Sequence, residues 1–344
     1  WAAMKGTRNM ELSGEWGSLG YPILLERGCL DVIGAHANLA RKVLLVTDEG
    51  VPEAYVRRVL AQCKEGYVVT LPQGEASKSL YQFETLLSRM LALGFDRQSA
   101  VLALGGGVVG DLAGFVAAGY MRGVDLINCP TTTLAQVDSS IGGKVAVNLA
   151  GAKNIVGAFY QPIFVAIDPD TLSSLPPRHY AAGLAEAVKA GLIADPALFE
   201  LFEEGDIEGN LLEILRRSLL VKKTLVERDE PGPRAALNFG HTLGHAIESL
   251  EGLGGLYHGE CVALGMLPMI EDAALRSRTE RVYKRLGLPC SIRYDGFKVF
   301  EFLQKDKKAA AGSITLVRVP TLGQYRLDKV ALAELPAIIG EGIA

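Results

Sequence analysis

The chain has 344 residues, which exceeds the size of one ordinary hydrophobic core, so we expect two domains. Its composition, 49% hydrophobic and 22% charged, is typical of a soluble globular protein, and no apolar run approaches the roughly 20 residues that a membrane span needs. The net charge of −4, without a basic block, argues against nucleic acid or an acidic membrane as a partner.

Strands and helices alternate in the first half of the chain. Apolar, β-rich runs predict buried strands, and helical patterns lie between them. The strands are expected at 42–48, 66–71, 99–104 and 124–129, and the helices at 51–63 and 79–93. This order predicts an α/β domain with an open, doubly wound (Rossmann-like) parallel sheet.

The second half looks mainly α-helical, and Leu175-Pro176-Pro177 is the expected boundary. We therefore expect an α/β domain over 1–177 and a helical domain over 178–344. Helices are predicted at 180–193, 211–227, 236–250, 260–274 and 278–286, and a short strand at 313–319.

The cysteines and the first residues indicate the compartment. The five cysteines show no CxxC spacing, which argues against a disulfide framework and a thiolate zinc site: Cys29, Cys63, Cys129, Cys261 and Cys290. The first residues lack the apolar segment of a signal peptide. A cytoplasmic protein is expected.

A glycine-rich turn follows the third predicted strand. Gly105, Gly107 and Gly110 satisfy GxGxxG between a strand and a helix, where backbone amides can meet a pyrophosphate. A purely structural turn is an equally good interpretation, because the motif does not follow the first strand. Asp48, at the end of another predicted strand, is a candidate ribose ligand.

Three of the five histidines lie close together in the sequence. His241 and His245 are spaced i,i+4 and share one helix face, and His258 follows after a glycine-rich linker. Upstream, Glu186 and Lys189 lie at i,i+3 in an apolar helix, where charges are expensive unless they are paired or bound to a metal. Two exposed rings on a surface helix are the alternative, but the buried carboxylate favours a divalent metal site.

Two lysines follow glycine-containing turns beside apolar segments, Lys144 and Lys153. Solvent exposure is the ordinary fate of a lysine, and a local anion site is the alternative that these turns favour.

Several separated motifs together resemble the 3-dehydroquinate synthase family and the other sugar-phosphate cyclases. The resemblance runs from about Pro22 to Gly323. Its motifs are Gly74–Lys78, Gly105–Asp111, Pro130–Lys144, Lys153-Asn154, the helix with Glu186 and Lys189, Asn238–His245, His258–Glu260 and Asp306–Lys308.

The resemblance implies two cofactors. Zinc, which cobalt can replace, is implied at Glu186, His241 and His258, with His245 beside the substrate in a proton relay. NAD⁺ is implied in the first domain, and it is regenerated in each turnover. The implied NAD⁺ contacts are Asp48, Glu75, Lys78, Gly105, Gly106, Gly107, Val108, Asp111, Thr131, Thr132, Lys144, Lys153, Thr171 and Ser174.

The implied substrate is a phosphorylated seven-carbon keto sugar acid, 3-deoxy-D-arabino-heptulosonate 7-phosphate. Its implied contacts are Arg122, Lys144, Lys153, Asn154, Lys189, Lys222, Arg234, Asn238, His245, Lys307 and Lys308. The implied catalytic residues are Asp138, Lys144, Lys189, Asn238 and His245. Arg122 is carried over as a contact from a neighbouring subunit, which implies a homodimer.

One segment departs from the family pattern. Pro231-Gly232-Pro233 replaces a longer acidic loop before Arg234, and Glu227 or Glu230 is the expected substitute for the missing acid. Three alternatives stay open: a cyclase acting on another sugar phosphate, a metal-dependent polyol dehydrogenase with net NADH production, and a non-catalytic nucleotide- or metal-binding protein.

Overall fold

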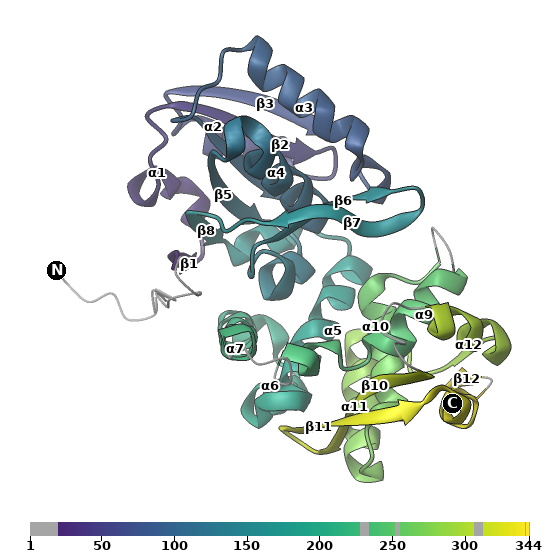
Figure 1. The fold of residues 1–344 in the computed structure, drawn as a ribbon. Coiled ribbons are helices and arrows are strands. Elements are labelled where there is room, and N and C mark those ends of the chain that lie inside the picture. Colours follow the sequence, from purple (N-terminus) through teal and green to yellow (C-terminus); the bar gives the residue numbers. More distant parts are fainter. Residues whose placement is uncertain (1–19, 228–233, 252–254, 306–311, 341, 344) are drawn as a thin grey trace. The chain divides into compact units, whose positions relative to one another are not determined.

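The structure is a computed structural model that describes residues 20–227, 234–251, 255–305, 312–340 and 342–343. The chain divides into two compact units, Trp1–Leu175 and Pro176–Ala344 (Figure 1). The first is an α/β unit and the second is mainly helical. The doubly wound parallel sheet expected from the sequence is confirmed.

A six-stranded parallel sheet forms the centre of the first unit. In spatial order its strands are β1 (Ile23–Leu25), β8 (Phe164–Ile167), β5 (Asp125–Pro130), β4 (Ala100–Gly105), β2 (Lys42–Asp48) and β3 (Glu65–Leu71). The helices are α1 (Ile33–His36), α2 (Glu53–Leu60), α3 (Leu80–Ala92) and α4 (Gly107–Gly119). The strands β1 and β8, which lie side by side at one side of the sheet, had not been predicted, since each is too short to show a pattern.

The sheet buries side chains on both faces. In β2, Val43 and Leu45 point to the core under α1 and α2, and Leu44 and Val46 point to the core under α3 and α4. This alternation follows from the two-residue period of a strand. Burial on both faces explains why β2 reads as an unbroken apolar run.

The order of the strands reverses between β2 and β4. After β2 the chain adds β3 on one side, then returns to add β4 and β5 on the other side. In open α/β sheets, ligands bind outside the carboxyl ends of the strands at such a switch point. Asp48 ends β2 and Gly105 ends β4, so both lie at this place.

A two-stranded antiparallel hairpin completes the first unit. It consists of β6 (Lys144–Leu149) and β7 (Ala152–Phe159), and it packs on α4. Lys144 opens β6, and Lys153 and Asn154 lie on β7. The hairpin had not been predicted from the sequence.

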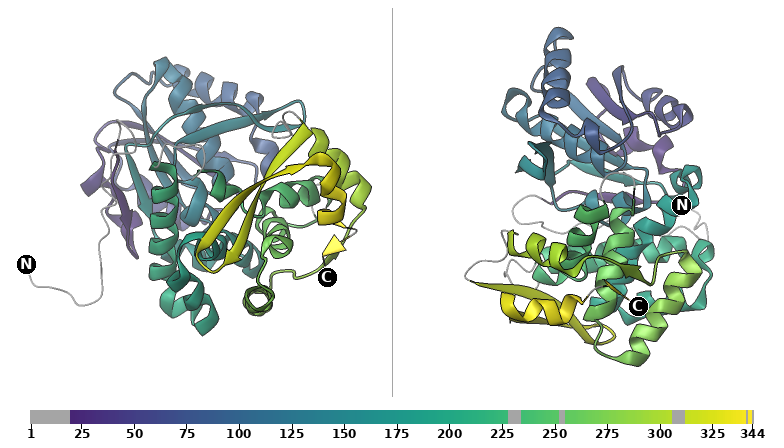
Figure 2. Two further views of the ribbon diagram at one scale, coloured as in Figure 1. Left: turned by 60° about the horizontal axis from the view of Figure 1, so that its bottom comes forward. Right: turned by 90° about the vertical axis from the view of Figure 1, so that its right-hand side faces the viewer.

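Helices dominate the second unit. They are α5 (Pro177–Ala194), α6 (Pro196–Glu204), α7 (Ile207–Glu227), α9 (His241–Glu251), α10 (His258–Met266), α11 (Ala273–Leu286), α12 (Gly296–Lys305) and α13 (Leu335–Ile339). A β10–β11 hairpin (Ser313–Thr321 and Gln324–Ala331) and the short pair β9 (Ile292–Arg293) and β12 (Gly342–Ile343) complete it (Figure 2, yellow end of the colour bar). Among the described residues, none of the helices has the length and apolarity to cross a membrane.

Two predicted helices have different bounds in the structure. The helix expected over 236–250 is interrupted by Gly240, whose φ of +75° is left-handed, so α9 starts only at His241. The helix expected over 260–274 ends at Met266, before a 3₁₀ turn that contains Pro268. A new helix, α11, then begins after Asp272, which accepts hydrogen bonds from the amides of Ala274 and Leu275.

Candidate functional site

The α5 helix brings two charged side chains into the core of the second unit. Its residues from Ala181 to Ile193 are buried, because alanines and glycines let neighbouring helices pack closely around it. The Lys189 ammonium forms an ion pair with Oε2 of Glu186 and donates a hydrogen bond to the Leu237 carbonyl at 2.9 Å. Within the described residues, Oε1 of Glu186 is buried and accepts no hydrogen bond.

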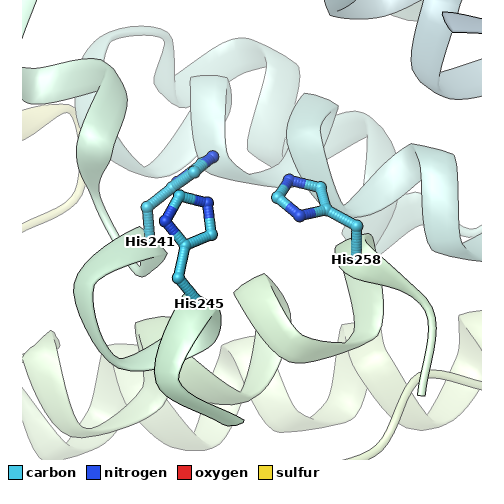
Figure 3. A group of neighbouring side chains, drawn as sticks. All are labelled: His241, His245 and His258. Carbon is cyan, nitrogen blue, oxygen red and sulfur yellow. The ribbon is translucent and has the colours of Figure 1, made fainter. Parts of the chain in front are cut away.

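Three imidazoles meet close to this carboxylate (Figure 3). His241 and His245 come from the first turns of α9, and His258 is the first residue of α10. One ring nitrogen of each histidine lies within 4.8 Å of those of the other two. Nε2 of His241 is 3.4 Å from Glu186 Oε1, and Nε2 of His258 is 3.9 Å from the same oxygen.

The other ring nitrogens show which atoms face the site. Nδ1 of His241 lies 3.1 Å from the Phe239 carbonyl, and Nδ1 of His258 lies 2.9 Å from Oε2 of Glu248. A carbonyl and a carboxylate accept hydrogen bonds, so each Nδ1 carries the proton. Each Nε2 then keeps its lone pair toward Glu186, as metal-binding histidines do.

Burial and the neighbouring groups shift the pKa values of the two rings in opposite directions. Burial, with the charge of Lys189, lowers the pKa of His241 well below its usual value, so this ring is neutral. Burial also lowers the pKa of His258, but the hydrogen bond to Glu248 and the charge of Glu186 outweigh it and raise that pKa.

Close packing holds α10 against α5. A side chain at Gly259 would place its Cβ 1.8 Å from the Ala182 carbonyl oxygen, so only glycine fits between the two helices. Next along the chain, Glu260 caps its own helix by accepting from the Tyr257 amide at 2.7 Å. Its carboxylate also accepts two hydrogen bonds from Arg178 on α5, each of 2.7 Å. The first turn of α10, and with it His258, is therefore fixed to the helix that carries Glu186.

The donor set fits a divalent metal. Two ligand atoms that are each about 2.1 Å from a tetrahedral zinc ion lie about 3.4 Å apart. The Glu186–His241 distance of 3.4 Å matches this spacing, and the unpartnered Oε1 of Glu186 needs a cation. His245 also lies within ligand distance of the other two rings. The protein ligands of such a metal are therefore His241, His258 and either Glu186 or His245.

The residues expected to contact a nucleotide gather around the switch point of the first unit. Asp48 and Gly105 end neighbouring strands, Gly106 caps α4, and Thr131 and Thr132 follow β5. Burial raises the pKa of Asp48, whose carboxylate accepts from the Gly50 amide at 2.8 Å. Gly107 and Val108 form the first turn of α4, so their amides lie at its N-terminus.

A second group of these residues forms a charged cluster. The buried Lys78 contacts Asp111 at 2.6 Å and Glu75 at 3.8 Å, and Glu75 accepts from Asn148 at 2.7 Å. Asp111 also lines a cavity together with Lys144.

Thr171 and Ser174 have their hydroxyl groups engaged inside the first unit. Thr171 is fully buried, donates to the Asp168 carbonyl at 2.7 Å and accepts from Gln136 at 3.0 Å. Ser174 donates to the Thr171 carbonyl at 2.8 Å. In this structure both hydroxyls support the fold.

The remaining expected residues are divided between the units. Arg122, with a left-handed φ of 69°, follows α4, and Asp138 lies in the π-helical turn Ala135–Ser139. In the second unit, Lys222 lies on α7, Arg234 precedes the 3₁₀ turn Ala236–Asn238, and Asn238 ends that turn. Outside the described residues lie Lys307, Lys308, Glu230 and the segment Pro231–Pro233.

Sequence reasoning missed Glu248 and Arg178. Glu248 lies seven residues after His241 and three after His245, so it shares their helix face, and this spacing was the available signal. Arg178 had no such signal, because its partner Glu260 lies far along the chain.

Solved structures show the same fold. A 2-deoxy-scyllo-inosose synthase complexed with carbaglucose-6-phosphate, NAD⁺ and Co²⁺ superposes with a TM-score of 0.87 at 27% identity, covering 98% of this chain and 100% of that one. The fold is therefore that of the sugar-phosphate cyclases.

Sequence relatives identify the family within this class. Models described as 3-dehydroquinate synthase N-terminal and C-terminal match residues 68–182 and 183–309. A 3-dehydroquinate synthase from Desulforamulus reducens is 44% identical over 351 residues, covering 94% of this chain and 98% of the relative. One from Thermodesulfovibrio yellowstonii is 38% identical, covering 95% and 98%. The chain belongs to the 3-dehydroquinate synthase family, which confirms the resemblance seen in its motifs.

Proposed function

We propose that this chain is a 3-dehydroquinate synthase. It converts 3-deoxy-D-arabino-heptulosonate 7-phosphate into 3-dehydroquinate and phosphate, and is thus a carbon–oxygen lyase acting on a phosphate. The observation that carries this proposal is the meeting of Glu186, His241 and His258, with the Nε2 atoms of the two rings 3.4 and 3.9 Å from the Glu186 Oε1, which accepts no hydrogen bond in the described part of the chain.

The proposed cofactors are NAD⁺ and a divalent metal, zinc or cobalt. Glu186 and the Nε2 atoms of His241 and His258 would hold the metal, and a further position stays open for substrate. When bound, the metal supplies Lewis acidity to two neighbouring substrate hydroxyls, and NAD⁺ takes up and returns a hydride.

Residues of the second unit act on the substrate in this proposal. Lys189 is held by Glu186 and the Leu237 carbonyl, so its ammonium is already positioned to donate a hydrogen bond to a carboxylate or hydroxyl of the substrate. His245 lies beside the metal ligands and relays protons to and from the substrate oxygens. Arg234, Asn238 and Lys222 bind the polar groups of the substrate, as do Lys307 and Lys308.

Residues of the first unit bind the nucleotide and the phosphate. Asp48 and the amides after Gly105 bind NAD⁺ at the switch point, as do Glu75, Lys78, Asp111, Thr131 and Thr132. Lys144 and Lys153 neutralise the phosphate dianion, Asn154 donates a hydrogen bond to it, and Asp138 orients Lys144. The elimination needs no strong general base from the chain, because the departing phosphate removes the neighbouring proton itself.

We further propose that the protein acts in the cytoplasm as a homodimer, with Arg122 reaching the phosphate of the neighbouring subunit. In the described part of the chain no cysteine forms a disulfide bond, which agrees with a reducing compartment.

The test is an assay of substrate choice. The purified protein with NAD⁺ and zinc is incubated separately with 3-deoxy-D-arabino-heptulosonate 7-phosphate, sedoheptulose 7-phosphate, glucose 6-phosphate and glycerol. Phosphate release from the first compound alone, without net NADH, supports the proposal. Release from another sugar phosphate indicates a different cyclase, and accumulation of NADH with glycerol indicates a polyol dehydrogenase.

Variants separate the ligands from the proton relay. Glu186→Gln and His258→Ala should both lose zinc and phosphate release. His245→Ala should keep zinc while turnover falls by about 10²–10⁴-fold, the range for a general acid or base. If His245→Ala loses zinc while Glu186→Gln keeps its full zinc content, the third ligand is His245 and not Glu186.

A further inference from the structure

The ring of His258 lies between two carboxylates. Its Nε2 faces Glu186 at 3.9 Å, and its Nδ1 lies 2.9 Å from Oε2 of Glu248. Glu248 comes from α9, the helix that also carries His241 and His245. The proposed function gives Glu248 no role, although this contact is shorter than either distance to Glu186.

The two proposed imidazole ligands are held by different acceptors. His241 has a neutral backbone carbonyl at its Nδ1, that of Phe239 at 3.1 Å. His258 has a charged carboxylate at the same ring position. A carboxylate accepts a stronger hydrogen bond than a carbonyl and raises the basicity of the ring, which strengthens a bond from Nε2 to a metal.

The contact also selects the tautomer of His258. If Nδ1 were the unprotonated atom, its lone pair would face a carboxylate oxygen at 2.9 Å, and the two acceptors would repel each other. Nε2 would then carry a hydrogen directed toward Glu186 and would have no lone pair for a metal. With the proton on Nδ1, that nitrogen donates to Glu248, and the lone pair of Nε2 is available to a metal.

The contact between Glu248 and His258 also links two helices. Figure 3 shows that His258 comes from a different helix from His241 and His245 and faces them across the site. The Glu248–His258 contact therefore joins α9 to the first residue of α10 beside the ligand atoms themselves.

We propose that Glu248 is a positioning residue of the metal site, which holds the His258 ring with its proton on Nδ1 so that Nε2 is offered to a divalent metal. This inference rests on the metal site of the proposed function. Glu248 touches neither the metal nor the substrate, and acts through His258.

The test measures metal binding without substrate. The metal-free full chain is titrated with Zn²⁺ against a chromophoric chelator, and with Co²⁺ while its visible absorption is recorded. Glu248→Ala should weaken Zn²⁺ binding by about 10–100-fold, the range for losing such a partner, and should alter the Co²⁺ spectrum. Glu248→Gln is nearly isosteric and keeps a neutral acceptor, so its affinity for Zn²⁺ should lie between that of the parent and that of Glu248→Ala.

Two controls separate this effect from general damage. Ser249→Ala changes the exposed neighbour on the same helix, and Glu208→Gln removes an exposed carboxylate from α7. Both should bind Zn²⁺ as the parent does.

The outcomes are distinguishable from failure of the proposed function. A parent that binds Zn²⁺, with both Glu248 variants within twofold of it and an unchanged Co²⁺ spectrum, overturns the inference alone. A parent that binds neither metal overturns the inference together with the metal assignment.

Discussion

The contact between α5 and α10 makes Gly259→Ala the most informative single substitution. Its new Cβ would lie 1.8 Å from the Ala182 carbonyl oxygen, whereas ordinary contacts begin near 3.4 Å. The helices must therefore separate by roughly 1.6 Å, since both partners are backbone or directly attached to it. His258 directly precedes Gly259, and Glu186 follows Ala182 by one helical turn, so this separation pulls the two proposed ligands apart.

Two effects follow from the separation. Overpacking of this kind destabilises by about 1–3 kcal/mol, and each kcal/mol lowers the melting temperature of a domain of this size by about 2–4 °C. We therefore expect a decrease of several degrees. Metal binding should suffer more, because ligand distances tolerate changes of only about 0.2 Å.

The assay is a thermal melt of the metal-free protein and a Zn²⁺ titration of each variant. Gly34→Ala is the matched control, since its nearest neighbour would be 3.6 Å from the new Cβ and its φ is not positive. This control should leave both quantities unchanged or raise the melting temperature slightly. A Gly259→Ala protein that melts and binds zinc like the parent would refute the reasoning.

Three further predictions concern charge and cofactors. Two hydrogen bonds from Arg278, of 2.8 and 2.6 Å, hold the pKa of the Glu203 carboxyl below its usual value. The ion pair therefore stabilises the folded protein above the unfolded pKa of about 4.3, and this contribution is lost as the pH falls through the lower folded pKa. Glu203→Gln should then cost about 1 kcal/mol at pH 7 in urea unfolding, and a difference that persists undiminished at pH 2.5 would contradict this. Lys78→Met removes the cation beside Asp111 and should weaken NAD⁺ binding about tenfold or more in calorimetry, with zinc content unchanged; unaltered NAD⁺ affinity would argue against the assignment. Removal of the metal with a chelator should abolish phosphate release, and added Zn²⁺ or Co²⁺ should restore it; turnover by the metal-free protein would contradict a catalytic metal.

The alternating elements of the first unit could be predicted because their cause is local. The strand 42–48 agrees with β2 at both ends, since its side chains are buried on both faces of the sheet. The hairpin that begins at Lys144 was missed, because β7 is largely exposed and carries no apolar alternation. In the second unit, the start of α9 depended on the left-handed Gly240, and an isolated glycine does not reveal its φ.

The site was predictable in its residue types and less so in its supports. The i,i+4 spacing of His241 and His245, together with a carboxylate in an apolar helix, is enough to indicate a metal site from the sequence alone. The partner of each Nδ1 could not be predicted, because it depends on how the backbone reaches Phe239 and on how α10 returns to Glu248. The roles of Gly259 and Arg178 could not be predicted either, because both depend on the contact between α5 and α10.

The two oxygens of Glu186 are in different circumstances, and this affects the order in which the site is assembled. Lys189 neutralises the carboxylate from within the same helix, so the core can close around it while no ion is present. The second oxygen stays available for an ion that arrives later. Unlike a zinc finger, which is unfolded without its metal, a domain whose buried carboxylate already has a cation on the same helix is expected to fold before the proposed metal binds.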